Sequence, residues 1–353
     1  MDRRNFLHPG HLINAAGNLL GAAAALDGAV EPPEPGGVPL LRVARRAMAT
    51  TFEIFLPFGI AQAQTIADSA FEEIDRLEQQ LTVYRDSSEV SRLNRVASQI
   101  AVPVEKNLFD LLALAARINE ETAGAYDVAA GALIKAWGFY KGPRRVPAAD
   151  ELAEALSRVG MQHVMLDHQA HSVRFLRRGL EINLGSIGKG YALDRVASLL
   201  RADWNLNSAL LHGGHSSMYA IGSEPDSESG WTVGIRHPGK TDCRLGIVRL
   251  RDRALGTSAA TFQHLEYNGR KLGHILDPRS GWPAEGLAAA TVVAPSAALA
   301  DALSTAFFIM GVDAARAYCG SHPEIGAVLV PQEESAAPVI IGLSPDDVTV
   351  YDA

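Results

Sequence analysis

Two segments toward the C-terminus carry the residues best suited to chemistry. The first, GHILDPRSGWP at 273–283, places an imidazole, a carboxylate and a guanidinium on a turn rich in Pro and Gly. The second, DALST at 301–305, places Asp301 and Thr305 four residues apart. On a helix this spacing puts both oxygens on one face, one turn apart. With no Cys nearby, an acid and a hydroxyl in this arrangement suit a hard cation such as Mg²⁺.

A magnesium ion held by few protein oxygens usually has a phosphate among its remaining ligands, so these residues predict chemistry on a phosphate ester or anhydride. His274 shares the turn with Asp277 and Arg279 and precedes the Asp301/Thr305 pair. We therefore expect a general base at His274, close to a magnesium-bound phosphate. Arg279 is expected to pair with Asp277 and to brace the turn.

A Gly-rich segment, EINLGSIGKGYALDRV at 181–196, reads as a strand, a turn and a helix start. Such turns leave backbone N–H groups at a helix N-terminus, where phosphate binds well, and Lys189 adds a positive charge. The segment is not a P-loop, because Gly185 and Gly188 are too close together and Gly190 follows the lysine. Gly-rich turns of this kind are also common for purely structural reasons.

Three further motifs have both a functional and a structural interpretation. Tyr126 and Asp127 could stack on a base and bond to it, although Tyr beside Asp is common in ordinary turns. Tyr84 precedes a Ser-rich helix start, for which capping by Ser87 or Ser88 is a sufficient explanation. The pair His212 and His215 has no second cluster that would complete a transition-metal site.

The elements that must position these residues follow from apolar spacing. Helices are predicted at 60–81, 107–122, 148–159, 189–202 and 297–310, with a short one from about Val312. Strands are predicted at 40–56, 163–167, 172–176, 180–184, 208–212, 217–221, 231–236, 246–251, 288–294 and 326–330, with a hairpin of 264–268 and 271–275 about Asn268-Gly269. Strands and helices alternate without a strict βαβ rhythm, so an α+β fold with largely antiparallel sheets and packed helices is expected.

Composition narrows the class of protein. The 353 residues are 47% hydrophobic and 20% charged, which is typical of a globular protein with a sizeable core. A net charge of −8 excludes a general nucleic-acid binder, since phosphate contacts need clustered Lys and Arg. Cys243 and Cys319 are too few for a disulfide framework; they could pair in an oxidising compartment or stay free.

The N-terminus differs from the rest of the chain. Arg3 and Arg4 precede a mildly apolar stretch rich in Gly and Ala, so residues 1–30 predict a twin-arginine export signal. A frayed low-complexity terminus is the alternative. A Pro/Gly-rich linker at 31–39 then leads to one folded domain, 40–345. The expected location is the periplasm or the outer face of the membrane, or the cytoplasm if the segment is not a signal.

Eight segments in sequence order resemble the ApbE-type flavin transferase family, the FAD:protein FMN transferases. They span roughly residues 44–330 and read MATTFEI, LTVYRDSSEVSRLN, GAYDVAAGALIKAWGF, INLGSIGKGYALDR, LHGG, TSAA, GHILDPRSGWP and ADALSTAFFIMG. The resemblance implies a tunnelling-fold-like α+β core that binds FAD. It implies a magnesium-dependent transferase that moves FMN from FAD to a Thr or Ser of an acceptor protein of a redox complex, releasing AMP. Two alternatives are an FAD pyrophosphatase and a non-catalytic FAD-binding protein.

The resemblance also assigns roles to single positions. It implies that His274 is the base that activates the acceptor hydroxyl, and that Lys189 contacts a phosphate. Magnesium ligands are implied at Ser186 (through its main-chain carbonyl), Asp301 and Thr305. Flavin or adenine contacts are implied at Met48, Tyr84, Ala125, Tyr126, Asp127 and Ile275, and at Asn183, where the family usually has an acidic residue.

The chain departs from the family pattern at four places. Ala49 replaces the Gly of the usual MGT, Asn183 replaces an acid, and His215 replaces the Asp of GGD. The stretch Ala259-Ala260-Thr261 lacks the common Gly-Asp-Tyr. Because the Asp301/Thr305 pair and His274 remain, we expect a working enzyme whose FAD affinity or acceptor choice has shifted.

Overall fold

An eight-stranded sheet organises the molecule, and every pair of neighbouring strands in it is antiparallel. The computed structural model describes residues 39–240, 243–260, 264–267, 269–333 and 335–351. The predicted signal and nearly all of the linker lie outside these residues. In spatial order the strands are β1 (Leu40–Ala47), β2 (Thr50–Pro57), β6 (Ala209–Gly213), β7 (Ser217–Ile221), β10 (Ala254–Ala259), β13 (Leu287–Ala294), β14 (Gly326–Pro331) and β15 (Val339–Ile341).

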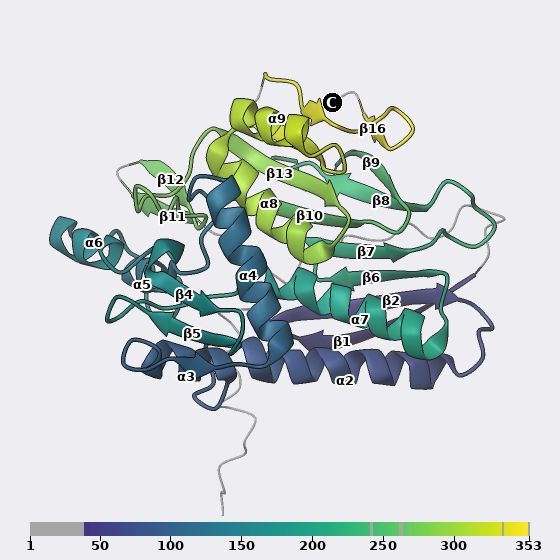
Figure 1. Ribbon diagram of the computed structural model, residues 1–353. Helices are drawn as coiled ribbons and strands as arrows, with labels where there is room; N and C mark the ends of the chain where they lie inside the picture. The colour runs from purple at the N-terminus through teal and green to yellow at the C-terminus, as the bar shows by residue number, and fades with distance from the viewer. Residues whose placement is uncertain (1–38, 241–242, 261–263, 268, 334, 352–353) are drawn as a thin grey trace, which may run out of the picture.

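The two faces of this sheet contribute to two separate cores, because side chains alternate along each strand. On β13, Ala290 and Val292 belong to the larger core under the helices, whereas Ala289 and Val293 face the opposite side. The helical side is covered by α2 (Ala63–Leu81), α7 (Gly188–Trp204), α8 (Ala297–Met310) and α9 (Val312–Ser321) (Figure 1). The opposite face packs against a three-stranded sheet of β16 (Val348–Val350), β9 (Arg244–Leu250) and β8 (Trp231–Arg236).

Shorter elements form a lateral lobe at the left of Figure 1, beside the long helix α4 (Lys106–Glu121). A small core around Trp137 joins several of them, including Leu272 of the hairpin. The lobe contains α3 (Glu89–Val96), α5 (Gly131–Ala136), α6 (Ala149–Leu156), the 3-10 turn η2 (Met161–His163), the sheet β3 (Val102–Pro103), β5 (Ser172–Phe175) and β4 (Val164–Asp167), and the hairpin β11 (His264–Tyr267) and β12 (Arg270–Gly273).

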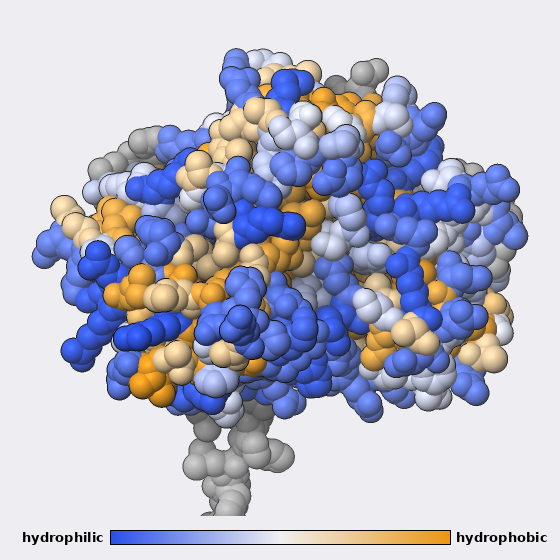
Figure 2. All heavy atoms as spheres, in the orientation of Figure 1, coloured by the Kyte–Doolittle hydropathy of each residue, from blue (hydrophilic) through white to orange (hydrophobic). Residues whose placement is uncertain are grey.

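The α+β fold and its antiparallel sheets are confirmed, and so are the main predicted helices. α2, α4, α7 and α8 lie within a few residues of the predicted ranges, and α3 is capped as expected, since Ser88 accepts from the Ser91 amide at 3.0 Å. Both cysteines are free, Cys243 exposed and Cys319 buried, so they do not pair. Among the described residues, no helix is long and apolar enough to span a membrane. Polar residues dominate the face in Figure 2, and apolar ones gather over the lateral lobe and along a central band.

One predicted strand is in fact two. Residues 40–56 form the hairpin β1–β2, which turns at Met48 and Ala49, with φ of 48° and 61°. A two-residue hairpin turn of type I′ needs positive φ at both central positions, which Asn and Gly supply most easily. Met48-Ala49 is not a typical turn sequence, so the turn could not be predicted from the residues.

A second prediction, a strand at 180–184, is wrong. This segment is extended, but its hydrogen bonds go to a side chain and to a loop rather than to a neighbouring strand. The Ile182 amide donates to Asn94 Oδ1 at 2.8 Å, and the Asn183 amide donates to the Val128 carbonyl at 2.8 Å. Apolar alternation therefore indicated burial here, not membership of a sheet.

Candidate active site

Helix α8 lies unusually close to its neighbours, and two glycines make this possible. A Cβ built at Gly256 of β10 would stand 2.5 Å from the Ala300 carbonyl, and one at Gly190 of α7 would stand 2.1 Å from the Ala297 carbonyl oxygen. Any side chain at either position would push α8 outward. The glycines thus let α8 pack directly against the sheet and α7. We call this contact region around Gly190 and Gly256 the seat of α8, and it fixes the position of Asp301.

Asp301 is buried in that seat and bonded from two sides. Its side chain accepts from Ser217 at 2.7 and 2.9 Å and from the Gly190 amide at 2.8 Å. Ser217 is the first residue of β7 and pairs with Gly256 across the sheet. The sheet and α7 therefore each donate one hydrogen bond to the only carboxylate of α8.

Burial raises the pKa of Asp301 to about 6, although the charge of Lys189 and the hydrogen bonds from Ser217 and Gly190 oppose the rise. A buried carboxylate costs much free energy to ionise unless positive charge compensates it. Lys189 supplies part of that charge. A bound cation would supply more and would hold Asp301 in its ionised form.

Thr305 lies one turn further along α8, within a chain of hydroxyls. Its Oγ1 lies 3.1 Å from Ser258 Oγ on β10 and 3.3 Å from the Asp301 carbonyl oxygen. Ser258 Oγ also lies 2.9 Å from Ser304 Oγ. A threonine that binds a cation uses an oxygen lone pair and must direct its proton elsewhere. Ser258 and the Asp301 carbonyl offer two such acceptors.

Ser186 and Tyr126 lie in the same neighbourhood. Ser186 Oγ donates to the Tyr126 hydroxyl at 3.4 Å, and burial together with the charges of Asp301 and Asp127 raises the pKa of Tyr126 well above its usual value. Ser186 therefore contacts Tyr126, and both Tyr126 and Lys189 interact electrostatically with the Asp301 carboxylate. Ser186, Tyr126 and Lys189 come from the turn before α7, the loop before α5 and the first turn of α7.

The donors at this place fit a hard cation. A carboxylate and hydroxyls supply only oxygen, which Mg²⁺ prefers, and a single carboxylate leaves most ligand positions to waters or phosphate. Across the described ranges, no three His, Cys, Asp or Glu side chains come together as a metal-binding group. Asp301 and Thr305 supply oxygen donors of this kind from one face of α8.

The Gly-rich turn before α7 differs from its prediction. Its amides were expected to be available for phosphate, but four of them already donate within the protein. The amides of Ile187 and Gly188 go to the Leu184 carbonyl, that of Gly185 goes to Asn183 Oδ1, and that of Gly190 goes to Asp301. Lys189 remains the candidate phosphate contact of this turn.

His274 begins the strap, by which we mean residues 274–285 between β12 and β13. Gly273, just before it, lies against Ala260, since a Cβ at Gly273 would stand 2.9 Å from the Ala260 Cβ. Ala260 comes two residues after Ser258, whose hydroxyl meets Thr305. The chain just before His274 therefore lies beside the end of β10, the strand whose Ser258 contacts Thr305.

The predicted brace within the strap is present. The Arg279 guanidinium donates to both carboxylate oxygens of Asp277, at 2.9 and 2.8 Å. The strap is fixed to the lateral lobe by Trp137, whose indole N–H donates to the Gly281 carbonyl at 2.8 Å. Trp282 meets the same indole edge-on, with ring centroids 5.4 Å apart.

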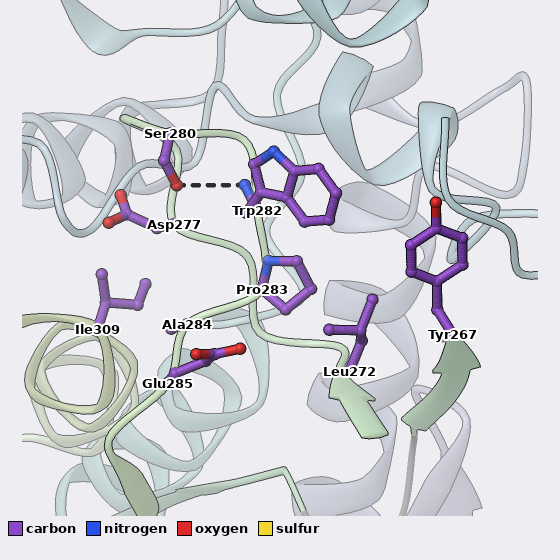
Figure 3. A pocket seen from close by; sticks show the side chains of 9 residues that line it. All are labelled: Tyr267, Leu272, Asp277, Ser280, Trp282, Pro283, Ala284, Glu285 and Ile309. Atoms are coloured by element: carbon purple, nitrogen blue, oxygen red, sulfur yellow. Dashed lines mark hydrogen bonds between the residues drawn. The ribbon is translucent and has the colours of Figure 1, made fainter. Parts of the chain in front are cut away.

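A cavity of about 560 Å³ opens between the strap, the β11–β12 hairpin and α8 (Figure 3). Trp282 and Tyr267 line it and are 41% and 43% exposed, so it has aromatic walls open to solvent. Ile309 of α8, one turn beyond Thr305, lines the same cavity. The space therefore adjoins the strap that carries His274 and the helix that carries the Asp301/Thr305 pair.

Met48 and Tyr84 form a second neighbourhood around the end of α2. The Met48 amide donates to Glu78 Oε2 at 2.9 Å, and Glu78 pairs with Arg85 at 3.8 Å. Tyr84 is 57% exposed and stacks on Tyr140 with ring centroids 4.9 Å apart and planes inclined by 5°. The stacked pair offers a flat aromatic surface at this edge of the molecule.

The remaining predicted contacts are largely engaged within the protein. Asp127 accepts from the amides of Ala129 and Met161, and burial raises its pKa to about 6. It lines a separate cavity of about 520 Å³, whose other wall includes Pro278 and Arg279 of the strap. Ala125 and Ile275 are buried, and the Asn183 side chain holds the Gly185 amide.

The histidine pair is split by the fold. His212 is buried on β6 against Phe55, with ring centroids 5.3 Å apart, and burial lowers its pKa to about 3. His215 is exposed beyond the end of the strand. Their different surroundings are those of a core histidine and a surface histidine.

Comparison with known proteins assigns this arrangement to a family. The sequence model of the ApbE family matches residues 48–329, which is most of the chain. The chain belongs to the ApbE family. Its fold is also that of a solved ApbE protein from Thermotoga maritima, with a TM-score of 0.78, 28% identity and coverage of 86% of this chain and 97% of the other.

Two curated relatives extend the match, and both are described as FAD:protein FMN transferases. The protein of Treponema pallidum (strain Nichols) is 31% identical over 284 residues, which is 76% of this chain and 78% of the relative. That of Escherichia coli (strain K12) is 27% identical over 311 residues, which is 84% and 87% of the two chains. ApbE proteins are thus similar to this chain along nearly all of its folded part.

Sequence reasoning missed the residues that support the site from β7 and β10. Ser217 follows a Gly-Gly-His-Ser run and is too far from Asp301 in the sequence to form a recognisable motif with it. Gly256 stands in a short run of small residues, ALGTSA. β10 itself was not predicted, because it has no aromatic residue and Thr257 is its only β-branched one. Its small side chains are the available clue, since they permit the close approach of α8.

Proposed function

We propose that this protein is an FAD:protein FMN transferase, which moves FMN from FAD to a Thr or Ser hydroxyl of an acceptor protein. The observation that carries the proposal is the buried Asp301 carboxylate, which interacts with the charge of Lys189 and precedes the Thr305 hydroxyl by one turn of α8, in a chain of the ApbE family. Acid, hydroxyl and cationic side chain together suit an anionic phosphate substrate and its divalent cation.

Asp301, Thr305 and the Ser186 carbonyl would hold Mg²⁺. When bound, magnesium neutralises charge on the pyrophosphate. Lys189 would hold a phosphate oxygen from the first turn of α7. Met48 and Tyr84 would contact the flavin or adenine part of FAD. Tyr84 is exposed and stacks on Tyr140, whereas Ala125 and Tyr126 are buried.

His274 would act as the general base. It accepts the proton of the acceptor hydroxyl as that oxygen bonds to the FMN phosphorus. The bond between this phosphorus and the bridging oxygen breaks, and AMP leaves with the bridging oxygen. Binding both partners in one geometry supplies much of the rate, since it replaces an encounter in solution.

We also propose a place of action from the sequence of the N-terminus. Arg3-Arg4 and the Gly/Ala-rich stretch after them support export by the twin-arginine route, with action on exported domains of redox complexes in the periplasm or at the membrane's outer face. Fractionation of cells that express the full chain, compared with an Arg3→Lys, Arg4→Lys variant, tests this; cytoplasmic retention of only the variant is expected.

Mass spectrometry of a candidate acceptor tests the activity. An exported redox-complex domain incubated with the protein, FAD and Mg²⁺ is expected to gain the mass of one FMN, and to gain nothing when EDTA is added. Release of FMN and AMP without an acceptor adduct would point to a pyrophosphatase instead. FAD that stays intact with magnesium present would point to a binding protein.

A further inference from the structure

The Asp301 carboxylate is held by a side chain that is not itself among the expected ligands. Ser217 is completely buried, and its hydroxyl lies 2.7 and 2.9 Å from the two oxygens of Asp301. It reaches them from β7, because Gly256, its partner on β10, lets α8 pack directly against the sheet. Serine and carboxylate thus belong to elements that the fold holds rigidly together.

The hydrogen bonds leave Asp301 able to bind a cation. Ser217 has one hydroxyl proton and Gly190 one amide proton, whereas a carboxylate offers about four acceptor positions on its two oxygens. Two protons therefore occupy about half of that capacity. They also fix the plane of the carboxylate, because one comes from the sheet and the other from α7.

From this geometry we propose that Ser217 is a positioning residue for the metal site: it orients the Asp301 carboxylate so that the lone pairs left unoccupied by the protein face the cation. The inference rests on the proposed function, in which Asp301 is a magnesium ligand. Without Ser217, the Gly190 amide alone would hold the side chain, and rotation about its terminal torsion would be hindered at one oxygen only. Groups that orient metal ligands typically contribute about 10- to 100-fold to metal affinity or activity.

A similar arrangement supports Thr305. Ser258 on β10 lies 3.1 Å from the Thr305 hydroxyl and 2.9 Å from that of Ser304. A hydroxyl ligand is weaker than a carboxylate, and the Asp301 carbonyl is a second acceptor for the Thr305 proton. Loss of the Ser258 hydroxyl should therefore weaken binding of the cation less than loss of the Ser217 hydroxyl does.

The test measures Mn²⁺ binding to the full chain by electron paramagnetic resonance, with neither FAD nor acceptor present, so that turnover plays no part. Ser217→Ala is expected to raise the Kd for Mn²⁺ about 10- to 100-fold. Ser217→Thr, which keeps the hydroxyl on a residue that suits a strand, should restore most of the affinity. Ser172→Ala is the matched control, because Ser172 is a buried serine on β5 of the lateral lobe.

Thermal unfolding of the metal-free variants separates positioning from a merely structural hydrogen bond. A Ser217→Ala protein that melts earlier but binds Mn²⁺ with the parent Kd would overturn the proposal. Asp301→Ala distinguishes failure of the role proposed for Ser217 from failure of the assignment of Asp301 as a metal ligand. If Asp301→Ala loses Mn²⁺ and Ser217→Ala does not, only the role of Ser217 fails; if Asp301→Ala binds like the parent, the metal assignment fails and the role of Ser217 with it.

Discussion

The seat of α8 and the strap are built in opposite ways. The seat is buried between the sheet and two helices, and its carboxylate is held by donors from β7 and α7. The strap is a turn at the surface, fixed by the Asp277–Arg279 pair and by Trp137, and its residues line two cavities. A rigid part suits a small ion whose ligands must be placed accurately. An accessible part suits a large partner that brings its own hydroxyl.

The largest effect is expected at the rigid side. Asp301→Ala should abolish FMN transfer, because the remaining oxygen donors are uncharged and would hold magnesium poorly. The measurement is FMN incorporation into an acceptor at saturating FAD. Asp313→Ala, which removes an exposed carboxylate of α9, is the control and should keep the parent rate. If Asp301→Ala transferred FMN at the parent rate, Asp301 would not be a ligand of the catalytic metal.

At the accessible side, His274→Ala should slow transfer by about 10²-fold or more, the usual loss for a general base. FAD binding, followed by flavin fluorescence, should stay near the parent value, since the seat and the Tyr84 platform are untouched. His168→Ala serves as a control for loss of an exposed imidazole. A variant at His274 that transfers FMN at full rate would make this residue a structural part of the turn.

A substitution under α8 tests how far the seat depends on close approach. Gly256→Ala places a methyl group 2.5 Å from the Ala300 carbonyl, so overpacking should cost about 1–3 kcal/mol in the free energy of unfolding. Urea denaturation measures this, and Mn²⁺ affinity should fall in the same variant as Asp301 moves. Gly320→Ala in α9 has open space around it and should be neutral or slightly stabilising. Equal effects from the two substitutions would contradict the account of the seat.

The smallest expected effect concerns pH. Asp194 of α7 accepts from the amides of Ala297 and Ala298 at the start of α8, and burial raises its pKa to about 7. A raised folded-state pKa stabilises the protein fully below the unfolded value near 3.8, and this stability is lost as pH rises through about 7. One proton corresponds to a slope of at most about 1.4 kcal/mol per pH unit. Asp194→Asn should flatten that slope in metal-free protein.

Urea denaturation at pH values from 4 to 8 checks the prediction, with Asp313→Asn as the control that keeps the parent slope. An Asp194→Asn protein with unchanged pH dependence would mean that other buried carboxylates, such as Asp127 and Asp301, account for it.

Sequence patterns predicted the long helices and the pairing of Asp301 with Thr305 on one of them, because helical periodicity is a local property. The Asp277–Arg279 brace was also predictable, as both residues lie in one short turn. The contacts of Ser217 and Gly256 with α8 were not, since they join residues far apart in the chain through close approach of backbones. The Met48-Ala49 turn was concealed for a different reason, because it uses residues that rarely take positive φ.

The contrast between local patterns and long-range contacts also explains why the hydrogen bonds of the Gly-rich turn were not predicted. Its composition indicated backbone amides at a helix start, and the helix does start there, at Gly188. Which acceptor each amide finds depends on the rest of the fold. The Gly190 amide meets Asp301, a residue 111 positions away, so local pattern alone could not assign it.

The most direct test of the central claim is a crystal structure of the protein with FAD and Mn²⁺, using the anomalous signal of manganese. One manganese is expected at about 2 Å from an Asp301 carboxylate oxygen and from the Thr305 hydroxyl, with an FAD phosphate oxygen among its ligands. Manganese bound elsewhere, or FAD phosphates remote from the seat of α8, would contradict it.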